Sequence, residues 1–306
     1  MLVSLIIVIA VAPLGVVSTQ PMTTNRISRL MERVLHCNAG LDLARDTAIP
    51  FIVGDEAVGL VLPRAATILE GFPEVFSVTP EAVRLSGGGS TLESRSKAVM
   101  QVLERLREDD VAPMLRGWRD ETWPVKKAFH SEPKLLLERS AVPLFGVRGY
   151  GSFVNGLVGD HHAWIARRSQ DKPTYPGMLD VIVAGGLAHG ELPSDNVLKE
   201  CQEEASIPLE LARQVVPRGL VTYTSVDETG WGLKQDALFV YDLHLPESFA
   251  PIPNDGEVES FELMSMTDVI TSLCEDHDAW KPNVCLVLLD LLVRRGHVTP
   301  DEEGYV

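Results

Sequence analysis

Residues 185–207 read GGLAHGELPSDNVLKECQEEASI, and this stretch decides the fold that we expect for the 306-residue chain. Its second half has helical periodicity, because Leu198, Cys201 and Ala205 stand at i, i+3 and i+7 and form one apolar stripe. Two glycines open the stretch, and glycine favours a turn or a close approach of the backbone. The stretch therefore predicts a glycine-containing loop that leads into an amphipathic helix.

Three glutamates share one face of this predicted helix. Glu200, Glu203 and Glu204 stand at i, i+3 and i+4, where like charges repel by a few tenths of a kcal/mol per pair, on the order of 0.2–0.5. A divalent cation offsets that repulsion, because Mg²⁺ takes oxygen ligands from carboxylates and from substrate phosphates. A solvated acidic face would explain the same residues, so the three carboxylates alone do not establish a metal site.

The spacing around the helix favours the metal site. Gly185, five residues, Glu191, seven residues and then KECQEEASI at 199–207 resemble the Nudix box, which fixes a glycine, four glutamates and their register. Two positions depart from that motif. Lys199 stands in place of an arginine and lacks its planar fork, and Ser206 stands where glycine best tolerates the left-handed conformation. Neither departure removes a carboxylate.

The resemblance covers about residues 30–306. It is carried by GWRDETWPV (117–125), LFGVRGYG (144–151), ARRSQDKPTYPGMLDVIVAGGLAHG (166–190), NDGEVESFELMS (254–265) and KPNVCLVLLDLLVRRG (281–296). Together these segments are similar to one Nudix subfamily, which comprises plant Nudix hydrolases and the Nudix half of fungal thiamine pyrophosphokinase. That subfamily has an extra domain before the Nudix domain.

The resemblance implies an α/β (α+β) fold: a Nudix α/β/α sandwich preceded by a small α+β domain. Runs of strand-like and helix-like sequence agree with mixed layers. We expect three parts: an apolar extension or signal at 1–21, the α+β domain at 22–140 and the Nudix domain at 141–306.

The resemblance also implies site residues. Transferred to this sequence, the metal ligands are Glu200, Glu203 and Glu204 with the backbone carbonyl of Ala184, and the cofactor is Mg²⁺ or Mn²⁺. Glu200 or Glu257 takes the proton of the attacking water, so the expected catalytic residues are Glu200, Glu203, Glu204 and Glu257.

Residues before the box and in the first domain are candidates for substrate binding. Arg167, Arg168 and Lys172 suit phosphate oxygens, whereas Tyr175 suits a flat ring. From the N-terminal domain, Trp118 and Arg119 are expected to close the site, although an interdomain packing seam would explain them as well.

Composition excludes several classes of partner. With 43 acidic and 27 basic residues the net charge is −16, which disfavours binding to nucleic acid. The apolar run at 2–12 is too short to span a bilayer and lacks a positive start, so we expect no membrane partner and a cytoplasmic protein. An organellar or secreted protein is the alternative, should the run be a signal. A homodimer is one option for the assembly.

The implied function is metal-dependent hydrolysis of a small-molecule diphosphate. The subfamily points to thiamine diphosphate or its oxidised analogues, with release of the monophosphate and phosphate; 8-oxo-dGDP or another oxidised nucleoside diphosphate is the alternative substrate. Two other classes are kept open: an isomerase of isopentenyl-diphosphate type and a non-catalytic Nudix binding module. The isomerase needs a reactive cysteine, and Cys201 lies on the apolar stripe instead.

Overall fold

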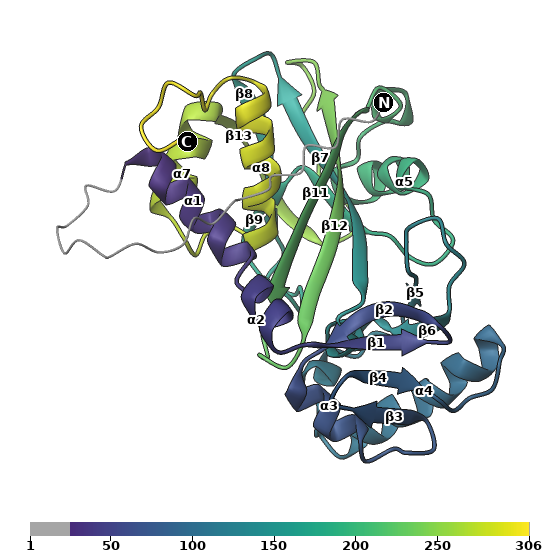
Figure 1. Cartoon of the computed structure of the whole chain (residues 1–306). Coiled ribbons are helices and arrows are strands. Elements are labelled where there is room, and N and C mark those ends of the chain that lie inside the picture. The colour runs from purple at the N-terminus through teal and green to yellow at the C-terminus, as the bar shows by residue number, and fades with distance from the viewer. Residues whose placement is uncertain (1–24, 306) are drawn as a thin grey trace.

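The computed structural model describes residues 25–305, so the expected extension at 1–21 lies outside the described residues. The chain forms a larger mixed sheet with helices on both faces and a smaller α+β unit below it in Figure 1. No helix within residues 25–305 combines the length and the apolar character needed to cross a bilayer.

The larger sheet is built around β7 and contains both strand directions. Its strands follow the order β11 (Val216–Val226), β12 (Leu233–His244), β7 (Arg148–Val158), β8 (His162–Arg168) and β13 (Val258–Ser265). Two short strands join it: β9 (Leu179–Val181) pairs with β8, and β10 (Val183–Gly186) pairs with β7. The β12–β7 pair is parallel, and the other pairs of this sheet are antiparallel.

Helices cover both faces of this sheet. One face carries α5 (Pro193–Ala205) and α6 (Leu209–Ala212), and the other carries α1 (Arg26–Cys37), α7 (Met266–Glu275) and α8 (Pro282–Arg294). Successive strand residues point to opposite faces, so Phe153 joins the cluster under α8 and Val154 joins the cluster under α5. This arrangement confirms the expected α/β/α sandwich.

The smaller unit has its own sheet and core. Its strands follow the order β2 (Glu56–Val61), β1 (Ile49–Val53), β4 (Ala82–Leu85) and β3 (Phe76–Thr79), with α3 (Pro63–Leu69) and α4 (Leu92–Glu108) packed around it. A separate hairpin of β5 (Thr122–Val125) and β6 (Leu135–Glu138) completes the unit. Phe51, Phe76 and Phe145 lie together in its core.

The N-terminal helices belong spatially to the larger sheet. Helix α1 precedes the smaller unit in the chain, yet Leu30 and Val34 pack in one cluster with residues of α7 and α8. Helix α2 (Gly40–Asp46) follows it and packs against β11, where Gly40 lies so close to Ser225 that a Cβ would stand 2.7 Å from a backbone atom. The chain therefore crosses from one unit to the other after residue 46.

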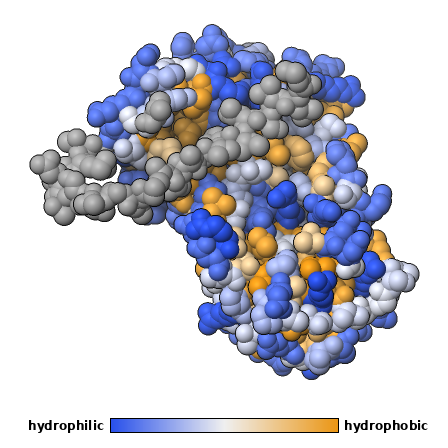
Figure 2. Space-filling model, in the orientation of Figure 1, coloured by the Kyte–Doolittle hydropathy of each residue, from blue (hydrophilic) through white to orange (hydrophobic). Residues whose placement is uncertain are grey.

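The two units are in direct contact. The side-chain amide of Gln235 on β12 donates to the carbonyl of Gly146, next to Phe145 of the smaller core, and Trp231 of the β11–β12 loop packs on that core. Hydrophilic residues predominate on the face shown in Figure 2, and apolar residues gather mainly over the smaller unit and near its junction with the larger one.

Candidate active site

Helix α5, which carries three of the box glutamates, has a characteristic residue at each of its two ends. Pro193 occupies its first turn, where proline's fixed φ and missing N–H are tolerated. Ser206 ends the helix in the left-handed conformation at φ 51° that glycine usually adopts, and its hydroxyl donates to the carbonyl of Ile252 at 2.9 Å. This hydrogen bond gives the serine a partner in a conformation that it otherwise disfavours.

Gly185 brings the backbone of strand β10 against the first box glutamate. A Cβ on Gly185 would stand 2.4 Å from Oε1 of Glu200, so any side chain there would displace that carboxylate. The glycine is therefore needed for space, and it places Glu200 directly over the loop that precedes the helix.

Glu204 is the buried carboxylate of the site. It is 5% exposed, and its Oε2 accepts a hydrogen bond from the backbone N–H of Ala184 at 2.9 Å. Burial raises the pKa of Glu204 to about 8, and the negative charges of Glu200, Asp180 and Glu257 raise it further against the effect of that hydrogen bond. The described residues offer this carboxylate one hydrogen bond and no salt bridge.

The ammonium group of Lys199 lies between two of the box glutamates. Its Nζ lies 2.7 Å from Oε1 of Glu191 and 3.4 Å from Oε1 of Glu200. Asn196 donates to the carbonyl of Gly186 at 3.2 Å and to Glu200 at 3.1 Å. Lys199 thus ties Glu191 to the helix, although the sequence departs from the arginine of the motif here.

The donor set fits a hard divalent cation. Glu200, Glu203 and Glu204 supply carboxylate oxygens from one helix, and burial together with neighbouring carboxylates raises the pKa of Glu200 as well as that of Glu204. A buried carboxylate without a cationic partner is unfavourable, and a bound cation removes that penalty. As the side chains lie, no three His, Cys, Asp or Glu residues between 25 and 305 close around a common point, and Glu203 is exposed.

Glu257 forms an ion pair with Lys172. Although burial acts in the opposite direction, this pairing lowers the pKa of Glu257, and Arg168 and Arg139 lower it further. Glu257 also contributes to the negative potential at Glu200 and Glu204, which places it near the box helix. The structure therefore places Glu257 and Lys172 near the box helix. The positive charge of Lys172 is already opposed there by the carboxylate of Glu257.

Two arginines of the smaller unit face the site, and Arg139 was not expected from the sequence. A Cβ on Gly186 would lie 3.0 Å from Nη2 of Arg139, and the guanidinium stands 5.2 Å from the ring centre of Trp123. Burial and the adjacent Arg139 lower the pKa of Arg119, so two guanidinium groups lie close together. Nη1 of Arg139 already pairs with Oε2 of Glu121 at 2.6 Å, whereas Nη2 lies on the side of Gly186. An anion there would accept hydrogen bonds from Nη2 and from Arg119, because arginine binds phosphate oxygens through its N–H groups.

The other expected substrate residues have different surroundings. Arg168 is buried and pairs with Asp180 at 3.2 Å, and Arg167 donates to the carbonyl of Gly177 at 2.9 Å. Trp118 packs on the core of the smaller unit with Arg107 over its ring. The polar or aromatic groups of these three residues already have partners within the protein. The sequence, in contrast, suggested groups that are free to contact a phosphate or the ring of a substrate.

Tyr175 lies away from the box helix, on the loop between β8 and β9. It lines a separate cavity together with Tyr223, and its backbone has a φ of 53°. A positive φ is unusual for a residue other than glycine and marks a locally strained position.

Comparisons with known proteins agree with this geometry. The NUDIX domain family matches residues 152–285, and a domain of unknown function, DUF4743, matches residues 29–149. Nudix hydrolase 20, chloroplastic, from Arabidopsis thaliana is 38% identical over 92% of this chain and 76% of its own length. Nudix hydrolase 24, chloroplastic, from the same plant is 36% identical over 94% of this chain and 78% of its own length.

One solved structure illustrates a more distant likeness. The NUDIX domain of NrtR from Shewanella oneidensis, solved with ADP ribose, aligns with a TM-score of 0.38 and 12% identity over 50% of this chain and 91% of that chain.

The chain belongs to the Nudix hydrolase family. It is an enzyme that acts on phosphorus anhydrides of small molecules, and enzymes of this family generally use divalent metal ions such as Mg²⁺ or Mn²⁺.

The structure also bears on the isomerase alternative. Cys201 is fully buried in the cluster beneath α5, and burial raises the pKa of its thiol to about 12. A buried thiol of this kind is inert at neutral pH, because the reactive species is the thiolate. Cys201 therefore acts as an apolar core residue, as expected from the stripe.

Proposed function

We propose that this enzyme hydrolyses thiamine diphosphate or its oxidised analogues to the monophosphate and phosphate. The observation that carries the hydrolysis is the buried Glu204, which lies on the box helix beside Glu200 and forms no salt bridge with any residue between 25 and 305. The sequence resemblance to the thiamine-related subfamily supports the choice of substrate. An oxidised nucleoside diphosphate such as 8-oxo-dGDP is the second candidate.

Glu200, Glu203, Glu204 and the carbonyl of Ala184 would hold the metal ion. When bound, such an ion would supply positive charge to offset that of the diphosphate and would lower the pKa of a water molecule. Glu200 has a raised pKa, caused chiefly by burial, which suits acceptance of the water proton near neutral pH. Glu257 remains the alternative base, and its pairing with Lys172 keeps it ionised.

The smaller unit would contribute to phosphate binding. Arg119 and Arg139 provide positive charge opposite the acidic helix, in a chain whose net charge is −16. Their guanidinium groups would orient the diphosphate by paired hydrogen bonds. On this proposal the smaller unit completes the site that the larger sheet and its box helix begin.

A substrate panel tests this function. We expect purified protein with Mg²⁺ to release phosphate from thiamine diphosphate and its oxidised forms with a kcat/KM at least tenfold above that for 8-oxo-dGDP, ADP and isopentenyl diphosphate. Chelation of the metal with EDTA should abolish the reaction, and added Mg²⁺ should restore it. Higher kcat/KM for 8-oxo-dGDP would establish the second candidate, and Mg²⁺ binding without turnover on any diphosphate would favour a binding module.

Two locations in the cell are candidates for this protein. The two Arabidopsis relatives carry the word chloroplastic in their names, which supports an organellar location beside the cytoplasmic one expected from the sequence. Cell fractionation combined with sequencing of the mature N-terminus distinguishes the two.

A further inference from the structure

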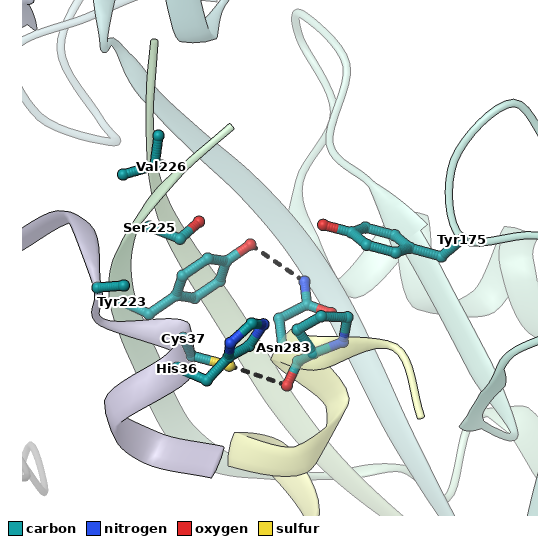
Figure 3. A pocket seen from close by; sticks show the side chains of 9 residues that line it. His36, Cys37, Tyr175, Tyr223, Ser225, Val226 and Asn283 are labelled. Atoms are coloured by element: carbon teal, nitrogen blue, oxygen red, sulfur yellow. Dashed lines mark hydrogen bonds between the residues drawn. The ribbon is translucent and has the colours of Figure 1, made fainter. Parts of the chain in front are cut away.

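Three asparagines in the described part of the chain have an Oδ1 atom that is buried and makes no hydrogen bond: Asn155, Asn196 and Asn283. An unpaired buried acceptor is unfavourable, so the reason for each asparagine must lie in what its Nδ2 group does. Asn155 donates to Asp242 at 3.0 Å, and Asn283 donates to the hydroxyl of Tyr223 at 3.2 Å in the cavity shown in Figure 3. Each of these two has one acceptor, whereas Asn196 has three.

Asn196 connects three segments of the Nudix box. It lies near the start of α5 and is 1% exposed, and its Nδ2 donates to the carbonyl of Gly186 at the end of β10, at 3.2 Å. The same Nδ2 lies 3.3 Å from Oε2 of Glu191 in the loop and 3.1 Å from Oε1 of Glu200 on α5. All three neighbours are acceptor oxygens, so the donor end of the amide has to face them, and exchange of the two amide ends is excluded.

Helical spacing places Asn196 one turn before Glu200. The two residues stand at i and i+4, so their side chains share one face of α5. Oε1 of Glu200 accepts from Asn196 and lies 3.4 Å from Nζ of Lys199, which is closer, at 2.7 Å, to Glu191. Oε2 of Glu200 has no hydrogen bond to any residue between 25 and 305. One oxygen of this carboxylate is therefore held, and the other is left for a ligand.

The same amide holds the end of the strand that carries Ala184. The carbonyl that accepts from Asn196 belongs to Gly186, two residues after Ala184 on β10. Gly185, between them, lies so close to Glu200 that a Cβ would stand 2.4 Å from its Oε1. Loss of the Asn196 amide would therefore release both the carboxylate of Glu200 and the strand end that packs against it.

We propose that Asn196 is a positioning residue for the metal ligands: it holds Oε1 of Glu200 and the carbonyl of Gly186, so that Oε2 of Glu200 stays free to bind the ion. The inference rests on the proposed function, which assigns Glu200 and the carbonyl of Ala184 as ligands. The Nδ2 of Asn196 is a donor and does not bind a cation, so its effect on the ion passes through Glu200 and Gly186. Residues next to a metal ligand often tune metal affinity in this way.

Calorimetric titration of metal-free protein with Mn²⁺ tests this role without turnover. We expect Asn196→Ala and Asn196→Leu each to weaken Mn²⁺ binding at least tenfold, because both remove the donor, although Asn196→Leu still fills the space of the amide. Asn155→Ala is the matched control. It removes a buried amide that also has an unpaired Oδ1 and donates to a carboxylate, but that carboxylate, Asp242, pairs with Arg294 of α8 and not with the box. Asn155→Ala should leave the Mn²⁺ affinity unchanged.

Kinetics provide a second readout. With the best diphosphate substrate, both Asn196 variants should need at least tenfold more Mg²⁺ for half-maximal rate, whereas KM for that substrate at saturating Mg²⁺ should change less than threefold. A role limited to folding would not produce this difference between metal and substrate. Thermal melting in metal-free buffer identifies the variants that are folded.

The outcomes separate this proposal from the proposed function. Wild-type Mn²⁺ affinity in folded Asn196→Ala or Asn196→Leu would overturn the positioning role and leave the proposed function intact. An equal loss of affinity in Asn155→Ala would also overturn that role, because loss of any buried amide would then be sufficient. Failure of the wild type to bind Mn²⁺ would contradict the metal site of the proposed function and, with it, this inference.

Discussion

Glu204→Gln should reduce kcat for the best diphosphate substrate at least 100-fold and leave the protein folded. The substitution replaces a proposed metal-binding carboxylate with an amide, and loss of several kcal/mol of charge stabilisation corresponds to about two or more powers of ten in rate. The amide oxygen can still accept the hydrogen bond from Ala184 that Glu204 accepts. Steady-state kinetics at saturating Mg²⁺ measure the effect.

The pH dependence of the stability of this variant is a second prediction. Burial raises the pKa of Glu204 to about 8, so in metal-free buffer the carboxyl is stabilising while protonated, and this contribution is lost as the pH rises from the unfolded value through about 8. Glutamine cannot ionise, so the melting temperature of Glu204→Gln at pH 8–9 without metal should be no lower than that of the wild type. Glu210→Gln, an exposed change on α6, is the control for both measurements. Full activity in Glu204→Gln would refute the assignment of Glu204 as a ligand.

Arg139→Ala should raise KM about 10- to 100-fold with a smaller effect on kcat. The guanidinium lies against Gly186 of the box loop and next to Arg119, and hydrogen bonds to charged groups are worth about 1.5–3 kcal/mol each. Arg139→Lys should recover part of the loss, because lysine keeps the charge but not the paired N–H groups. Initial rates over a range of substrate concentrations measure the change.

Arg116→Ala is the matched control for this arginine. Arg116 lies in the same unit and pairs with Asp110 on an exposed surface, so its removal should leave both KM and kcat unchanged. An unchanged KM in Arg139→Ala would mean that the smaller unit does not contribute to phosphate binding through this residue.

Local patterns in the sequence were sufficient to predict the box helix. The apolar stripe through Leu198, Cys201 and Ala205 predicts a helix, and these three residues lie on helix α5. The packing of α1 could not be predicted in the same way. Its amphipathic pattern requires an apolar partner but does not specify that α8, which lies more than 240 residues later in the chain, provides it.

The residues of the candidate site likewise include some that the sequence could predict and others that it could not. Glu200, Glu203 and Glu204 could be proposed because their spacing on one helix is fixed by the sequence. Arg139 could not, since its position beside Gly186 depends on how the smaller unit packs against the box loop. Arg168 stays a prediction: its charge suggested phosphate binding, and in the fold it pairs with Asp180, twelve residues later and on the neighbouring strand β9.

Anomalous diffraction from crystals grown with Mn²⁺ would locate the bound metal ion in the protein. We expect a manganese peak bounded by the carboxylates of Glu200, Glu203 and Glu204 and the carbonyl of Ala184, and loss of this peak in Glu204→Gln crystals. Mn²⁺ should be present at a concentration that supports activity. A peak of full occupancy elsewhere, with those carboxylates still bound only to Lys199, Asn196 and Ala184, would contradict this expectation.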